Sequence, residues 1–175
     1  MPLDQHGYYD MDRHRSQAFL YGGHDPGVCC RLIGATCLAM LGFPDQARDW
    51  ANESIALGER VEHPFSLAMA LSFSTTASYF RRDPEAAQAQ AERLAALCEE
   101  HGFAQFGAMA GIMRGWAMAA QDRASEGVNH IGDGVATMRS VGFRRLGFQL
   151  DTRINLHILH PRAGDGVFGC FFSGF

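Results

Sequence analysis

Charge of one sign is not concentrated anywhere along this chain. The 175 residues include 15 arginines and lysines against 19 acidic residues, which gives a net charge of −4, and the basic residues are scattered. Proteins that bind nucleic acid carry a basic patch or stripe. The composition therefore indicates that nucleic acid is not a partner.

Long apolar runs are also missing. No stretch reaches the roughly 18 apolar residues that a membrane-spanning helix needs, so we expect no membrane partner. The first residues, MPLDQHGYYDMDRHR, are acidic and contain histidine without an apolar segment. They do not resemble a secretory signal.

Paired cysteine motifs are absent too. The chain has five cysteines: Cys29, Cys30, Cys37, Cys98 and Cys170. They form an odd set without a C-x-x-C pair, and three of them fall at expected helical positions. This pattern favours buried free thiols in a reducing compartment. We therefore expect a cytoplasmic protein, and its 47% hydrophobic and 19% charged residues are typical of one soluble domain.

A repeat is the dominant feature that is present. The segments GFPDQARDWANESIALGERVEHPF, RDPEAAQAQAERLAALCEEHGF and RASEGVNHIGDGVATMRSVGF follow one another at a spacing of 40 residues. Pro44, Pro84 and Ala124 are equivalent under this shift. A fixed period of this size is typical of stacked helical hairpins.

Capping and apolar patterns predict six long helices, which begin near residues 26, 44, 64, 84, 104 and 124 and end near 41, 60, 81, 101, 121 and 141. Asp25-Pro26 and Asp83-Pro84 are start signals, because a carboxylate can cap free amides while proline occupies the first helical position. The first of these helices is apolar nearly all round, which predicts packing on more than one side. In the last, Gly127, Gly132 and Gly134 each cost about 1 kcal/mol relative to alanine, which predicts the weakest helix.

The fold class that follows is all-α: a solenoid of antiparallel helical hairpins. We divide the chain into a lead-in with a short helix (1–25, the helix near 12–21), three hairpins (26–143) and an irregular tail (144–175) with a possible helix at 146–159. Terminal repeats of solenoids need a polar outer face, and neither end supplies an obvious one. We therefore expect either a piece of a longer array or an altered C-terminus.

The small residues at Ala47, Ala51, Ala87 and Ala91 give the hairpins a resemblance to tetratricopeptide (TPR) helices, in a variant with longer helices. The stretch FLYGGHDPGVCCRLIGATCLAMLGFPDQA resembles the C-terminal TPR-like region of large bacterial proteins that also carry a class III adenylate/guanylate cyclase domain and an AAA-type ATPase domain. The resemblance covers about residues 10–143 and implies a regulatory or interaction region. The usual large aromatic near the start of each first helix is absent.

Catalytic motifs of those larger proteins are missing from this chain. It has no G-x-x-x-x-G-K-[ST] loop and no paired aspartates like those that bind metal in a cyclase. The cluster of serines and threonines at 72–76 has no glycine-framed elbow, and such hydroxyls usually bond back to the preceding helical turn. We expect neither enzymatic activity nor a cofactor.

The function we favour from the sequence is a non-catalytic interaction or regulatory scaffold. Stacked hairpins form a concave surface lined by the first helix of each pair, which suits a peptide, a protein, or another domain of a parent protein. Periodicity places five candidate residues on this surface: Ser66, Ser74, Thr75, Gln105 and Arg114.

Two alternatives stay open. His24, Cys29 and Cys30 could serve a small-molecule or metal sensor, because His and Cys are zinc ligands. A capped helix start with buried thiols explains the same residues more simply, so we assign no metal ligand. The other alternative is self-association through uncapped, apolar ends.

Overall fold

The computed structural model describes residues 9–20 and 22–142, and every regular element in these ranges is helical. The six predicted long helices are confirmed, with each end within about one residue of its expected place. They are α2 (Pro26–Met40), α3 (Pro44–Arg60), α4 (Pro64–Phe80), α5 (Pro84–His101), α6 (Ala104–Ala120) and α7 (Ala124–Ser140). The possible helix at 146–159 lies outside the described residues.

The helix in the lead-in is shorter and less regular than predicted. The sequence suggested one helix near residues 12–21, whereas the chain forms α1 (Met11–His14) followed by the 3-10 helix η2 (Arg15–Phe19). The side chain of Asp10 accepts hydrogen bonds from the amides of Asp12 and Arg13 at 2.9 and 3.3 Å, so it caps this first turn.

Two predicted start signals act as expected. Asp25 accepts a hydrogen bond from the amide of Val28 at 2.9 Å, and Asp83 accepts one from the amide of Ala86 at 3.0 Å. Each carboxylate satisfies an amide that has no partner within its helix. His63 does the same for α4 through its Nδ1 atom, which lies 3.3 Å from the amide of Ser66.

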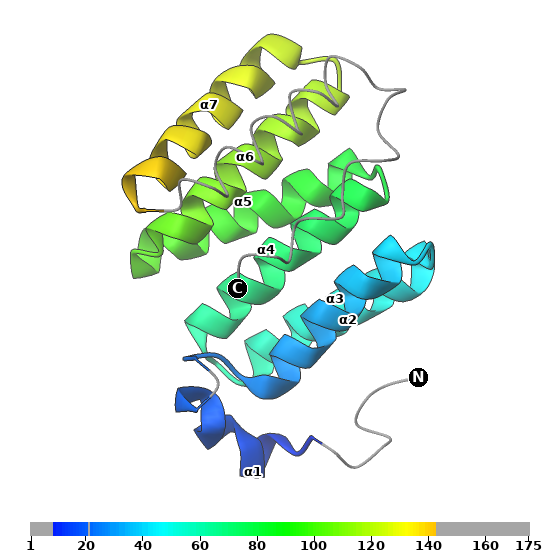
Figure 1. The fold of residues 1–175 in the computed structure, drawn as a ribbon, viewed down its shortest axis with the longest axis vertical. Coiled ribbons are helices and arrows are strands. Elements are labelled where there is room, and N and C mark those ends of the chain that lie inside the picture. Colours follow the sequence, from blue (N-terminus) through cyan, green and yellow to red (C-terminus); the bar gives the residue numbers. More distant parts are fainter. Residues whose placement is uncertain (1–8, 21, 143–175) are drawn as a thin grey trace.

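The helices follow one another as a chain of antiparallel neighbours (Figure 1). Helix α2 packs against α3 and α4, α3 against α4, α4 against α5, α5 against α6, and α6 against α7. The first helices of successive pairs also meet, α2 with α4 and α4 with α6. Two apolar clusters result: one joins α2, α3 and α4 to residues of α5 and α6, and the other joins α5, α6 and α7 to Tyr79 of α4.

The bulky apolar residues of α6 and α7 are mostly buried. Trp116 and four methionines are at most 8% exposed: Met109, Met113, Met118 and Met138. Trp50 is half-buried and its ring lies over Gly34, where a Cβ atom would collide with it. Glycine at position 34 therefore lets α2 and α3 approach around the indole.

Two of the three glycines in α7 have a packing role that the sequence did not reveal. A Cβ atom on Gly127 would lie 3.0 Å from the Ala119 amide nitrogen, and one on Gly134 would lie 2.7 Å from the carbonyl oxygen of Ala108. Both positions let α7 approach the backbone of α6. Gly132 is exposed with nothing within 4 Å of a Cβ atom.

Helix α2 is packed on more than one side, as predicted, because it contacts both α3 and α4, but one of its sides stays open. Its inner residues Val28 and Leu32 are buried at 1% and 2%, but Ile33 remains 41% exposed. The thiols of Cys30 and Cys37 are exposed as well, so the prediction of buried thiols is wrong for these two, although both are free. No other described helix covers this side of α2.

Candidate interaction surface

Ser66 belongs to a buried polar network rather than to an accessible surface. It is fully buried, its Oγ atom accepts a hydrogen bond from the amide of Asp25 at 2.8 Å, and it lies 2.8 Å from Nδ1 of His63. Asp25 in turn accepts from the hydroxyl of Tyr9 at 2.8 Å. The network joins the lead-in to the starts of α2 and α4, so Ser66 fixes how these segments meet.

Ser74 and Thr75 are also buried, at 2% and 0% exposure. The Thr75 hydroxyl donates to the carbonyl of Ser72 at 2.6 Å, and the Thr76 hydroxyl donates to the same carbonyl at 3.2 Å. Back-bonding of this cluster was expected from the sequence. Burial of Ser66, Ser74 and Thr75 is at odds with their predicted place on a surface that a partner could touch, because α4 is packed by neighbours on several sides.

Gln105 and Arg114, both on α6, remain partly exposed. The Nε atom of Arg114 is buried and has no hydrogen-bond partner among the described residues. Ser74 occupies the equivalent position of α4 under the 40-residue shift, and its Oγ atom likewise has no partner within the described part of the chain. One position of the repeat thus holds two unsatisfied polar atoms on neighbouring helices.

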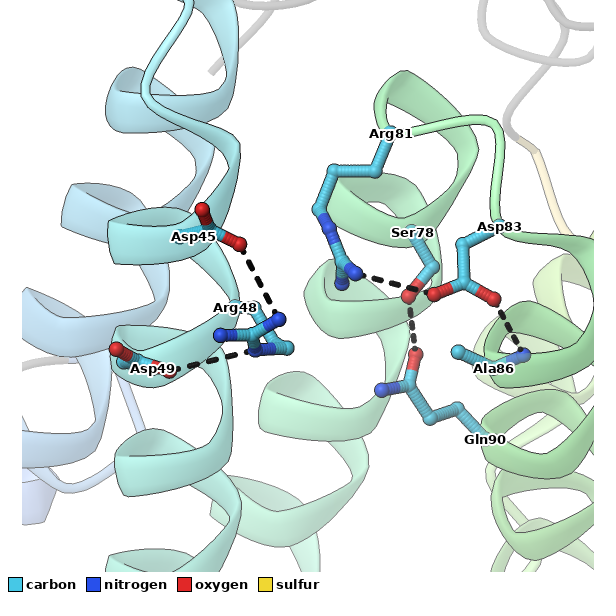
Figure 2. Close-up of polar contacts among 8 residues, drawn as sticks. All are labelled: Asp45, Arg48, Asp49, Ser78, Arg81, Asp83, Ala86 and Gln90. Atoms are coloured by element: carbon cyan, nitrogen blue, oxygen red, sulfur yellow. Dashed lines mark hydrogen bonds and ion pairs between the residues drawn. The ribbon is translucent and has the colours of Figure 1, made fainter.

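Two further polar groups lie on α3 and at the turn between α4 and α5. Figure 2 draws Arg48 between two carboxylates of α3, and Arg81 beside Asp83 at the turn. Arg48 pairs with Asp45 at 3.2 Å and with Asp49 at 3.4 Å, both on its own helix. Arg81 lies 3.1 Å from Asp83.

The partner of Arg81 was not predicted from the sequence. The other oxygen of Asp83 caps α5, so one carboxylate holds both the start of α5 and the guanidinium of Arg81 (Figure 2). Ser78 donates to Oε1 of Gln90 at 3.1 Å beside it. The D-P pair signalled the cap, but nothing in the sequence showed that Arg81 folds back on it.

The helix start that could have formed a metal site is organised differently. Asp25 is engaged by Val28 and Tyr9, Cys29 is half-buried and Cys30 is exposed. Within the described ranges no three side chains of His, Cys, Asp or Glu come together as a metal-binding group. The structure thus does not bring His24, Cys29 and Cys30 into a ligand set.

Burial raises the pKa values of two groups near the start of α2, Tyr9 and Cys29. Burial raises the pKa of the Tyr9 hydroxyl well above its usual range, and the hydrogen bond to Asp25 raises it further. Burial also raises the pKa of the Cys29 thiol, with the neighbouring Cys30 and Asp25 acting in the same direction. Both groups therefore stay neutral near pH 7, and a neutral thiol is a poor nucleophile.

Comparison with protein-family models, with curated proteins and with solved structures finds no match to this chain. Among the described helices, none is both long and apolar enough to cross a membrane.

Proposed function

We propose that residues 26–143 form a TPR-like α-solenoid, in which three hairpins repeat one packing geometry. The support is a pair of contacts related by the 40-residue shift. A Cβ atom on Gly58 of α3 would lie 3.5 Å from Cβ of Leu67 on α4, and a Cβ atom on Gly107 of α6 would lie 3.5 Å from Cβ of Cys98 on α5. Successive hairpins that meet at equivalent residues are what a solenoid requires.

The turns support the same proposal. A residue with positive φ follows each helix from α2 to α7 at a spacing of 20 residues: Gly42, Glu62, Arg82, Gly102, Asp122 and Gly142. Three of these residues are not glycine, although a positive φ disfavours other side chains. The connection geometry is thus imposed by the stacking and not by glycine alone.

The function we propose is a non-catalytic scaffold that binds a segment of another protein or of a parent protein's other domains. The observation that carries it is Arg114, whose buried Nε–H has no acceptor in the described structure although part of the side chain reaches the surface. A buried donor without a partner costs about 1–3 kcal/mol. A bound segment that supplies an acceptor would remove this cost.

Carboxylate-bearing peptides are the ligands that we expect. Arginine presents a planar fork of donors that matches a carboxylate in two parallel hydrogen bonds. Gln105 is also partly exposed on α6, but it lies nine residues before Arg114 and therefore on the opposite side of the helix, so we assign it no contact with the same peptide group. The resemblance to helical arrays of bacterial cyclase and ATPase proteins is compatible with a signalling partner in the cytoplasm.

Peptide selection tests this proposal without a known partner. A displayed library of random peptides is selected on the full chain, and the enriched peptides are measured by fluorescence polarisation. We expect enrichment of Asp and Glu, and a loss of affinity of about tenfold or more in Arg114→Ala, since a charge-assisted hydrogen bond is worth about 1.5–3 kcal/mol. Arg114→Lys should also weaken binding, because lysine lacks the Nε–H donor.

The matched control is Arg60→Ala, which removes an exposed guanidinium at the end of α3. It should leave the affinity within about twofold of the original, as expected for a surface charge away from the contact. If Arg114→Ala and Arg60→Ala lose the same affinity, the peptides are held by general electrostatic attraction and not by a contact with Arg114. Selected peptides that bind Arg114→Ala as tightly as the original chain would refute the role of Arg114.

A further inference from the structure

The exposed side of α2 is an apolar strip. Cys30, Ile33 and Cys37 are all exposed and lie at i, i+3 and i+7, which places them on one side of the helix. Leu41 extends the strip beyond the helix end with 70% of its surface exposed. None of these residues is charged, and the charged residue within α2, Arg31, is buried.

The repeat shows what covers the same strip in the other hairpins. Cys30 and Cys37 correspond to Ala70 and Ala77 of α4, which are 0% and 2% exposed, and to two residues of α6 that are 1% and 0% exposed, Ala110 and Ala117. The second helix of the preceding hairpin reaches this side of each first helix. A Cβ atom on Gly58 of α3 would lie 3.5 Å from Cβ of Leu67, one turn before Ala70. Likewise, Cβ of Cys98 on α5 lies 3.5 Å from the Cβ position of Gly107, one turn before Ala110.

Contacts at both ends define the register of α5 on α6. Cys98 of α5 lies at Gly107 of α6, and Gln121 at the end of α6 donates to Gln88 of α5 at 3.0 Å. The same shift assigns Met138 of α7 to Gly27 of α2, and Val128 of α7 to Leu41. Helix α7 is thus the element whose sequence positions match the strip on α2.

The two surfaces suit one another. Val128 and Leu41 are both exposed apolar residues, at 46% and 70%. Along the same edge of α7, Gly132 and Ala136 are exposed and small, so they permit close approach of a second helix. At Gly27 the ring of Tyr9 already occupies the equivalent place, with its atoms 2.5 to 2.7 Å from where a Cβ would stand. The lead-in thus covers the first turn of α2 and leaves the strip from Cys30 onward open.

We propose that α7 of one copy docks antiparallel on the strip of α2 of a second copy, so that the stack of hairpins continues from one molecule to the next. Such a contact is head-to-tail: the two surfaces differ, and each copy keeps one free end. The proposal rests on the stacked-hairpin part of the proposed function and not on peptide binding by Arg114. Failure of one can therefore be told from failure of the other.

The test is the molar mass of the full chain by light scattering, at increasing concentration and under a reducing agent that excludes disulfide-linked pairs. Cys37→Glu places a charge in the α2 strip, and Val128→Glu places one on α7. We expect the original chain to exceed its 19.2 kDa monomer mass as concentration rises, and each variant alone to remain monomeric. An equimolar mixture of the two variants should form a dimer, because each retains the surface that the other lacks.

Two control variants lie just outside the contact. Met40→Glu changes a residue of α2 whose equivalent on α6, Ala120, stays exposed although α5 packs on α6. Asn129→Glu changes a residue of α7 whose equivalent on α5, Ala89, is exposed as well. Both should associate like the original chain. If Cys37→Glu or Val128→Glu melts without cooperativity, Cys30→Glu and Ala136→Glu serve as the second pair.

Three results would overturn the proposal. The original chain could remain monomeric at every concentration, which would mean that another segment or partner covers the strip. Val128→Glu alone could still dimerise, which would indicate symmetric pairing through α2. The mixture of variants could stay monomeric although the original chain associates, which would exclude a head-to-tail contact.

Discussion

Replacing two neighbouring glycines of α7 by alanine should have opposite effects on stability. Gly132 is exposed with nothing near a Cβ atom, so Gly132→Ala should stabilise the protein by about 1 kcal/mol through helix propensity alone. At Gly134 the new Cβ atom would lie 2.7 Å from the carbonyl oxygen of Ala108 and 2.6 Å from Cγ1 of Ile112. The carbonyl belongs to the α6 backbone, so α6 and α7 would have to move apart.

The magnitude follows from a comparison within one helix. Both variants gain the same propensity, so the difference between their unfolding free energies isolates the overpacking at Gly134, which is worth about 1–3 kcal/mol. Urea unfolding followed by circular dichroism measures this difference. For a chain of this size each kcal/mol also shifts the melting temperature by about 2–4 °C. If Gly134→Ala stabilises as much as Gly132→Ala, the close approach of α6 and α7 is refuted.

Three further changes probe other parts of the structure. Ser66→Ala should lower the free energy of unfolding by about 1–3 kcal/mol, because it leaves the buried amide of Asp25 without its acceptor. Urea unfolding measures this loss, and Ser125→Ala, at an exposed position, is the control that should leave the free energy unchanged. Burial raises the pKa of Cys98 from 9.0 to about 11, so its neutral thiol contributes stability that is complete below pH 9 and is lost as pH rises through about 11. The unfolding free energy of Cys98→Ala should thus fall less steeply over pH 9 to 11 than that of the original chain, and parallel curves would contradict this. Glu62→Gly should stabilise by up to about 1 kcal/mol, since φ at this position is 52° and glycine adopts it without strain; a lower melting temperature would argue against that turn geometry.

Local signals in the sequence were sufficient for the helices. Proline after aspartate at residues 25–26 and 83–84 marks two helix starts, and the apolar period of α5 places Ala87, Ala91 and Leu94 in the core, where each is fully buried. These features depend on residues close together in the chain. The glycines of α7 could not be understood in this way, because their role depends on the backbone of α6.

The candidate site was predicted less well for the same reason. Periodicity gives the face of a helix, but α4 is contacted by four other helices, so Ser66 and Thr75 are buried although they are polar. Arg114 and Gln105 lie on α6, where part of the surface stays open. The exposed side of α2 was missed because an apolar sequence cannot show which of its sides finds a neighbour.

The most direct test of the repeated stacking is a disulfide between helices at the two equivalent contacts. Gly107→Cys would place its Cβ atom 3.5 Å from Cβ of Cys98, within the range of about 3.5–4.5 Å for disulfides. The double change Gly58→Cys and Leu67→Cys creates the same pair one repeat earlier, at the same 3.5 Å. Both are made with the remaining native cysteines replaced by serine, and the linked peptides are identified by mass spectrometry after mild oxidation. We expect both pairs to link, whereas Gly111→Cys, one turn further along α6, should not link to Cys98. Failure of either pair, or equally efficient linkage through position 111, would contradict a stack built on one 40-residue register.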